Sequence, residues 1–209
     1  MARLIQGRII VASHNEGKLA EMRELLEPYG IEAVSAGALG LVEPDETGTT
    51  FIANAKIKAE AATAATGLPA FADDSGLCVD ALGGQPGILS ARWAKEAGSF
   101  TLAMDGIERR LAAINAEPPY GARFVSALAL SRLGHETLTF VGTIEGTLTF
   151  PPRGKLGFGY DPIFLPEGMT RSFGEISSIE KHGIPADGSR ALSHRARAFQ
   201  DFARACLRD

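Results

Sequence analysis

The first hydrophobic positions along the chain follow a pattern typical of a strand and then a helix. The run RIIVAS, residues 8–13, is short and rich in β-branched residues, as buried strands are. From Leu19 to Leu26 apolar residues recur near helical spacing, and Pro28 and Gly30 end the pattern. The polar turn SHNEGK separates the two runs. The pattern therefore predicts a strand, a polar turn and a helix.

The same reasoning predicts the later elements. Residues 49–66 are rich in alanine, and Gly67 and Pro69 follow as helix-stop signals, so a second helix is expected there. An apolar stretch should then return through the core over 71–82, followed by a helix near 99–115. Runs of strand character over 123–133 and 136–150, on either side of a turn at 134, predict an antiparallel hairpin. A final amphipathic helix should begin near 193 and dock on the sheet.

Composition narrows the class of protein. The 209 residues can bury one large α/β core, and no repeat or linker marks a second domain, so a single domain over 1–209 is expected. A net charge of −4 with scattered basic residues argues against a nucleic-acid or membrane surface. The two cysteines lack the spacing of a disulfide framework or zinc site. The amino-terminal apolar run is too short for a signal or a membrane span, which favours a soluble protein of the cytoplasm.

Candidate chemistry lies in the polar turns. In SHNEGK, Lys18 follows a strand-to-helix turn whose free N–H groups suit phosphate, but the spacing is not that of a P-loop. From this turn alone, an ordinary cap by Ser13 or Asn15 is favoured. Before the second helix, Asp45 is expected to act as a helix cap, whereas Glu46 could reach a divalent cation.

The adjacent carboxylates Asp73 and Asp74 in FADDSGL allow two interpretations. In a turn, one would cap a local N–H and the other would be solvated. At the end of an apolar segment followed by small residues, the pair would instead suit a hard, oxygen-liganded Mg²⁺ ion. If they are buried, these like charges must be neutralised in some way.

Two further turns complete the set. Phe158 lies between two glycines in GKLGFGYDPIF, which leaves room for a flat base on its ring, whereas Tyr160 is at least as well explained as a core residue. In LSHRARAF, Ser193 can cap the last helix, and His194 and Arg195 lie at its positive end. Paired donors at a helix start can contact carbonyl or phosphate oxygens.

Taken in order, SHNEGK, ETGTTFIANAKIKA, ADDSGL with VDALGGQPGILSARWA, FGYDPIF and SHRARAF closely resemble the inosine triphosphate pyrophosphatase family over nearly the whole chain. The resemblance implies an elongated, twisted mixed β-sheet with flanking helices, in two lobes around a central cleft. It also implies a Mg²⁺-dependent homodimer that cleaves purine nucleoside triphosphates with a 6-oxo base (ITP, dITP, XTP) to the monophosphate and pyrophosphate.

The resemblance further implies roles for single residues. Asp74 would be the proton acceptor and, with Glu46, a magnesium ligand, while Asp73 would support the metal through water. The substrate contacts implied are Ser13, His14, Asn15, Glu16, Gly17, Lys18, Lys56, Ser75, Phe158, Gly159, Tyr160, Asp161, Lys181, His194 and Arg195. Among them, Lys18 and Lys56 would meet phosphates. Residues 158–161 would hold the base, and His194 and Arg195 would meet the base edge.

The chain departs from the family pattern at two places. Relatives usually carry a lysine about five residues before S-H-R, whereas here Lys181 is followed by an apparent insertion, so either Lys181 or Arg190 could fill that role. The first motif has Ser-His where many relatives have Thr-Gly, so His14 could contact substrate by its side chain or only by its backbone.

Other functions stay open at this stage. A purine nucleotide sensor without turnover would keep the stacking and phosphate residues but would not need the carboxylates, so Glu46 and Asp74 count against it. A pyrophosphatase for pyrimidine or modified nucleotides is the alternative within enzymes, and FGYD with S-H-R favours a 6-oxo purine over it. The sequence does not rank ITP, dITP and XTP.

Overall fold

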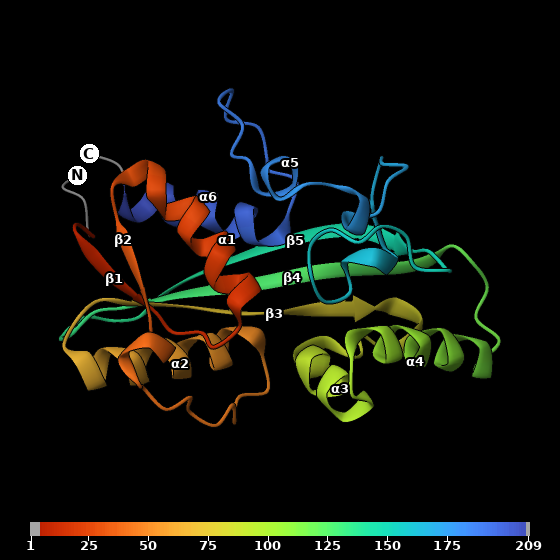
Figure 1. Ribbon diagram of the computed structural model, residues 1–209, viewed down its shortest axis with the longest axis horizontal. Coiled ribbons are helices and arrows are strands. Elements are labelled where there is room, and N and C mark those ends of the chain that lie inside the picture. The colour runs from red at the N-terminus through yellow and green to blue at the C-terminus, as the bar shows by residue number, and fades with distance from the viewer. Residues whose placement is uncertain (1–4, 208–209) are drawn as a thin grey trace. The chain divides into compact units, whose positions relative to one another are not determined.

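The computed structural model describes residues 5–207 and forms an α/β fold (Figure 1). A six-stranded sheet has the strand order β2-β1-β3-β4-β5-β6. It is a mixed sheet, because β1 pairs in parallel with β2 and β3, whereas β5 and β6 are antiparallel. The strands span Arg8–Val11 (β1), Glu32–Ser35 (β2), Ala70–Val79 (β3), Tyr120–Ser131 (β4), Leu138–Leu148 (β5) and Phe164–Pro166 (β6). The predicted fold class, a mixed sheet with flanking helices, is confirmed.

Six α-helices are present in the described residues. They span Glu16–Leu26 (α1), Phe51–Thr66 (α2), Ser90–Ala97 (α3), Phe100–Ala113 (α4), Ser178–His182 (α5) and His194–Cys206 (α6). Short 3-10 turns cover Glu27–Tyr29, Gly37–Leu39, Asp80–Leu82, Gly87–Leu89, Asp161–Ile163 and Phe173–Glu175. Within residues 5–207, every helix is too short or too polar to span a bilayer.

The chain divides into two compact units. Unit 1 contains the residues up to Asp74, Ser126–Gly142 and the residues from Ile184 onward; unit 2 contains Ser75–Val125 and Thr143–Gly183. Strands β3, β4 and β5 each supply residues to both units. No linker separates the units in sequence, which explains why no domain boundary was visible there.

Unit 1 has helices on both faces of its strands, with α1 and α6 on one side and α2 on the other (Figure 1). Side chains of a strand alternate between the two faces. Phe71 belongs to the core that includes Phe199 and Phe202 of α6. Its neighbours Ala70 and Ala72 belong instead to an alanine-rich core with α2. This alternation fixes the direction of the polar residues that follow in β3.

Unit 2 has its own aromatic core. Phe124 of β4 contacts Phe164 of β6 and Phe173, with ring centroids 4.7 Å and 6.1 Å apart. Phe100 of α4 meets the buried ring of Tyr160 edge-on at 5.3 Å. These ring contacts hold segment 158–164 against the core of unit 2.

The helix starts follow their capping residues. Asn15 caps α1 by accepting a hydrogen bond from the Lys18 N–H, and Ser193 caps α6 in the same way. The second predicted helix is confirmed as α2, but Thr50 caps it. Asp45 is five residues before that cap and exposed, so the expectation that Asp45 caps the helix was wrong. Strands β2 and β6 and helices α3 and α5 were not predicted.

Candidate active site

Asp73 and Asp74 lie within strand β3, so the turn that was considered for them is not present. As neighbours in a strand, they point to opposite faces of the sheet. Asp73 faces α1 and α6, and Asp74 faces α2, as their partners show below. Both residues are buried, with exposed fractions of 3% and 5%. Each carboxylate therefore needs its own neutralising partners.

On the α2 face, Asp74 belongs to a cluster of two carboxylates and one ammonium group. Lys58 Nζ lies 3.1 Å from Asp74 Oδ1 and 2.7 Å from Glu46 Oε1. The amide of Asn54 donates to Asp74 Oδ2 at 3.4 Å. Asn54 and Lys58 are four residues apart in α2, which brings them to the same side of the helix. We call Glu46, Lys58 and Asp74 the acid–lysine cluster.

The charges of this cluster do not cancel, because it holds two acids and one base. Burial raises the pKa of Asp74 above its ordinary value, an effect that Lys58 and Lys18 oppose and Glu46 strengthens. Burial acts to lower the pKa of Lys58, but the carboxylates of Asp74 and Glu46 outweigh it and raise that pKa. The pKa of Asp74 is thus closer to neutral pH than that of an exposed aspartate, which suits a proton acceptor.

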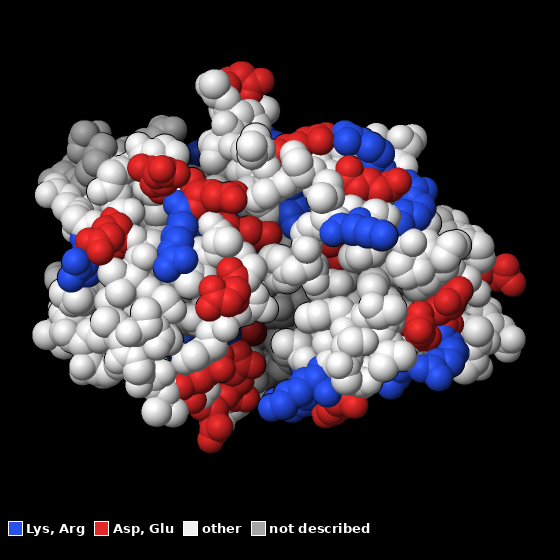
Figure 2. Space-filling view, in the orientation of Figure 1, with Lys and Arg blue, Asp and Glu red and all other residues white. Residues whose placement is uncertain are grey.

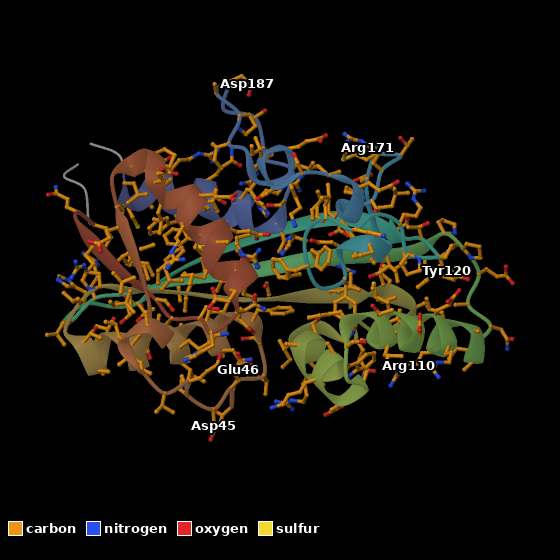
Figure 3. The ribbon with its side chains drawn as sticks, viewed as in Figure 1. Asp45, Glu46, Arg110, Tyr120, Arg171 and Asp187 are labelled. Atoms are coloured by element: carbon orange, nitrogen blue, oxygen red, sulfur yellow. The ribbon has the colours of Figure 1, made fainter. Side chains whose placement is uncertain are left out.

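Glu46 comes from the segment that leads into α2. Figure 3 shows Asp45 at the outer bend of this segment and Glu46 near it. Acidic side chains gather on the surface over this segment (Figure 2). Their negative charge would repel a polyphosphate, so an anionic ligand at this place needs a cation to accompany it.

The donor set suits a magnesium ion. Mg²⁺ in proteins is held by one or two carboxylates, and waters and substrate phosphates complete its shell. Glu46 and Asp74 supply two such carboxylates, and both already point at one cationic group, the ammonium of Lys58. Within residues 5–207 no third His, Cys, Asp or Glu joins them in a ready-made metal cage.

On the opposite face, Asp73 is surrounded by donors. Arg195 Nη2 and Lys18 Nζ both lie 3.0 Å from Asp73 Oδ2, and the Ser126 hydroxyl lies 2.5 Å from Asp73 Oδ1. The guanidinium of Arg195 also pairs with Glu21 of α1. Burial alone would raise the pKa of Asp73, but Arg195 and Lys18 outweigh it and hold that pKa well below its usual value. Asp73 is therefore ionised at neutral pH and anchors these donors.

Arg195 is 1% exposed, and its guanidinium lies between Glu21 and Asp73. Contact of this side chain with a base edge, as the resemblance implied, would require it to leave two carboxylates inside unit 1. These ion pairs tie α6 to α1 and β3, and the contact of Arg195 with the base edge stays a prediction. His194, the first residue of α6, is buried as well.

The first polar turn, residues 13–18, joins β1 to the start of α1. Ser13 is buried, and its hydroxyl accepts from the N–H of Asn15 at 3.1 Å. Glu16 is exposed and Gly17 is half-buried at the start of α1. Lys18 emerges from this first turn with its side chain 15% exposed and its ammonium on Asp73.

Helix α2 carries two lysines near the carboxylates in sequence, Lys56 and Lys58. Lys58, and not Lys56, contacts the carboxylates. Residues two apart in a helix point in nearly opposite directions, so Lys56 lies away from the acid–lysine cluster. The resemblance assigned the phosphate contact to Lys56, whereas the contacts place Lys58 in the cluster. The i,i+4 spacing from Asn54 was the signal that could have identified Lys58.

Unit 2 brings together Phe158, Asp161 and Lys181. Lys181 Nζ lies 2.8 Å from Asp161 Oδ2 and 5.6 Å from the centre of the Phe158 ring. The same Asp161 oxygen accepts the Phe158 N–H at 2.9 Å. Gly157 and Gly159 both have positive φ values of 73° and 69°, and a side chain at Gly157 would collide with Asp161. Asp161 thus holds both the ring and the lysine in position.

Three other predicted residues are placed as follows. Tyr160 is 2% exposed, its hydroxyl donates to the Ser90 carbonyl at 2.9 Å, and burial raises its pKa to about 12, so it is a core residue. Ser75 is half-buried on β3. Arg190 pairs with Asp201 at the surface of unit 1, whereas Lys181 is buried, which favours Lys181 for the lysine of the S-H-R motif.

Sequence reasoning missed Lys58, Asn54, Glu21 and Ser126 as site residues. Glu21 and Ser126 carry no local motif, and their roles arise only because α1 and β4 pack beside Asp73. Helical spacing from Lys18 places Glu21 on the same side of α1, which is the one sequence signal for it.

Comparison with known proteins agrees with this arrangement. The sequence profile of the Ham1 family matches residues 9–205. The dITP/XTP pyrophosphatase of Rhodopseudomonas palustris is 60% identical over 209 residues, covering 99% of each chain. The structure of a HAM1 protein from Coxiella burnetii is 35% identical and matches with a TM-score of 0.80, covering 96% of this chain and 98% of that one. The crystal structure of the nucleoside-triphosphatase / dITP/XTP pyrophosphatase from Mycobacterium abscessus is 43% identical and matches with a TM-score of 0.68, covering 81% of this chain and 88% of that one. The family resemblance drawn from the five motifs is confirmed, and this chain belongs to the Ham1 family.

Proposed function

We propose that this chain hydrolyses non-canonical purine nucleoside triphosphates with a 6-oxo base, namely dITP, ITP and XTP, to the nucleoside monophosphate and pyrophosphate. The observation that carries the proposal is the acid–lysine cluster, in a chain that is 60% identical to a dITP/XTP pyrophosphatase. A sensor without turnover would not need a buried acid of raised pKa beside a lysine, so an enzyme is favoured.

Asp74 is the proposed proton acceptor for the attacking water. Its raised pKa lets it take a proton from water more readily than an exposed aspartate can, and the nearby Lys58 ammonium stabilises the negative charge that develops. Lys18, held by Asp73, would contact the phosphates from the first turn of α1. The water would attack the α-phosphorus, so that pyrophosphate is the leaving group.

We propose that Glu46 and Asp74 hold a Mg²⁺ ion with the substrate. Bound there, the ion would neutralise phosphate charge and polarise the scissile bond. The support is the chemistry of the two carboxylates, which share a single lysine and leave one negative charge unbalanced.

For the base, we propose stacking on Phe158 of unit 2, with Lys181 as a hydrogen-bond donor. The ring is half-buried, Asp161 fixes its backbone, and Lys181 Nζ lies over the ring, 5.6 Å from its centre. A donor at the base edge suits a 6-oxo group, whereas adenine presents an amino group there.

We also propose that the protein works as a homodimer in the cytoplasm. Both of its cysteines, Cys78 and Cys206, are free thiols, which suits a reducing compartment. Multi-angle light scattering of the purified protein would measure the mass of the assembly, and a single-chain mass would refute the dimer.

One assay tests the proposal as a whole. Pyrophosphate release would be measured with dITP, XTP, ITP, dATP, dGTP and dTTP, with Mg²⁺ and with a chelator. We expect release from the first three in the presence of Mg²⁺ only. Equal rates with dATP, or full activity in chelator, would contradict the assigned substrate or metal.

A further inference from the structure

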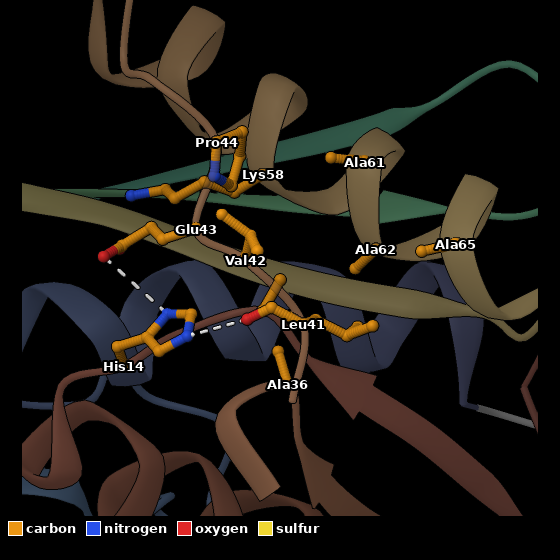
Figure 4. A pocket seen from close by; sticks show the side chains of 11 residues that line it. His14, Ala36, Leu41, Val42, Glu43, Pro44, Lys58, Ala61, Ala62 and Ala65 are labelled. Carbon is orange, nitrogen blue, oxygen red and sulfur yellow. Dashed lines mark hydrogen bonds and ion pairs between the residues drawn. The ribbon is translucent and has the colours of Figure 1, made fainter. Parts of the chain in front are cut away.

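His14 has a position that the proposed reaction leaves unexplained. Its ring Nε2 lies 3.1 Å from the Leu41 carbonyl oxygen, and Nδ1 lies 3.7 Å from Glu43 Oε2 (Figure 4). A carbonyl only accepts hydrogen bonds, so Nε2 carries the proton and donates to Leu41. The ring thus links the first polar turn to the segment 41–46, which ends at Glu46.

Segment 41–46 has few other attachments. The N–H of Leu41 donates to the Ala36 carbonyl at 3.0 Å, and the N–H of Gly48 donates to Asn54 Oδ1 at 2.8 Å. Between these two anchors, the polar contacts that the described residues show to the rest of unit 1 are those with His14 and the ion pair of Glu46 with Lys58.

Leu41 packs against the alanine-rich core, but a cavity of about 220 Å³ lies beneath the rest of the segment (Figure 4). Alanines of α2, among them Ala61 and Ala65, line one side of it, and Val42 and Pro44 line the other. Val42 is 90% exposed. A segment that spans a void loses the dispersion contacts that would otherwise hold it.

We propose that His14 is a positioning residue: it clamps segment 41–46 so that Glu46 stays beside Lys58 and Asp74. The proposal deepens the proposed function, since it gives Glu46 its place in the acid–lysine cluster. The loss of one such hydrogen bond should increase opening of the segment, and lower the apparent Mg²⁺ affinity that rests on Glu46, by about 3- to 10-fold.

Hydrogen exchange of the intact protein tests the clamp without any need for turnover. In His14→Ala, amide exchange over residues 42–48 should rise about 3- to 10-fold, with the rest of unit 1 unchanged. His14→Gln keeps an N–H donor that can reach Leu41 and should behave like the wild type. His135→Ala is the matched control, because His135 is an exposed histidine of unit 1 at the β4–β5 turn.

Kinetics then separates the clamp from a direct substrate contact. The clamp predicts that His14→Ala raises the Mg²⁺ concentration for half-maximal dITP turnover, while the dITP KM at saturating Mg²⁺ changes less than 2-fold. A raised KM with unchanged exchange would show that His14 touches the nucleotide, and it would overturn the clamp. Equal behaviour of the Gln and Ala variants would overturn it too. If the wild type released no pyrophosphate, the proposed function would fail, while the exchange result would still decide the clamp.

Discussion

The two neighbouring aspartates of β3 should respond in opposite ways to the same substitution. Asp73→Asn and Asp74→Asn each remove one negative charge at nearly constant shape. Asp73 anchors Arg195, Lys18 and Ser126, whereas Asp74 shares one lysine with a second acid. We expect Asp73→Asn to lower stability and Asp74→Asn to lower turnover.

The size of each effect follows from the contacts. Breaking a buried ion pair by removing one partner costs about 3–5 kcal/mol, and asparagine keeps part of the hydrogen bonding of Asp73, so about 3 kcal/mol is expected. For a chain of this length, that lowers Tm by about 6–12 °C. The raised pKa of Asp74 means that the fold disfavours its charged form, so a neutral amide there should lower Tm less than Asp73→Asn does. Turnover should fall about 100-fold or more, because the amide cannot accept a proton.

The effect at Asp73 should also depend on pH. Its pKa in the folded protein is lower than in the unfolded chain, so its contribution to the free energy of unfolding is complete above the unfolded pKa of about 4. That contribution is lost as the pH falls through the folded pKa. The Tm difference between the wild type and Asp73→Asn should therefore be full at pH 7 and shrink as the pH is lowered below about 4.

Differential scanning calorimetry from pH 3 to 7 and dITP turnover well below each Tm would measure both effects. Asp73→Asn should retain more turnover than Asp74→Asn under these conditions. Equal loss of stability in the two variants would refute the assignment of the aspartates to opposite faces. A fully active Asp74→Asn protein would remove Asp74 from the chemistry.

Three further predictions follow from single residues. Lys58→Met should lower dITP turnover at least 10-fold. The increase in Tm on addition of Mg²⁺ should be larger in this variant than in the wild type, because the ion then neutralises Glu46 and Asp74 alone. Lys56→Met should match the wild type in both assays. Lys18→Ala should raise KM for every triphosphate by a similar factor, since a phosphate contact carries no base information; a changed dITP:dATP ratio of kcat/KM would place Lys18 at the base. Phe158→Leu should weaken dITP binding by about 1–3 kcal/mol through lost stacking, measured as KM, with pyrophosphate binding unaffected.

The helices were predictable where local signals agree. Asn15 and Ser193 cap helices that also show apolar periodicity, and Gly67 ends α2 with the positive φ that glycine allows. Strand β2 gave no such signal, because it is four residues long, and one exposed and two half-buried residues blur its pattern. Helix α3 follows a glycine- and proline-rich stretch whose conformation is set by contacts with distant residues, such as the Tyr160 hydroxyl on Ser90.

The site was predictable in its residue types but not in its pairings. The Asp73–Asp74 pair indicated that buried charges would need neutralisation, yet the partners of Asp73 come from positions 18, 126 and 195, which only the folded chain brings together. For the same reason, Arg195 was expected at a base, while its nearest charges are two carboxylates of unit 1. A single sequence shows which charges exist; packing decides which of them meet.

The central claim is that Asp74 directs a water molecule at the α-phosphorus of a triphosphate. Turnover of dITP in ¹⁸O-labelled water, followed by mass spectrometry of the products, tests it most directly. We predict one labelled oxygen in dIMP, no label in pyrophosphate, and loss of the labelled product in Asp74→Asn. Label in pyrophosphate, or labelled inorganic phosphate with dIDP, would show attack at another phosphorus and would contradict the account.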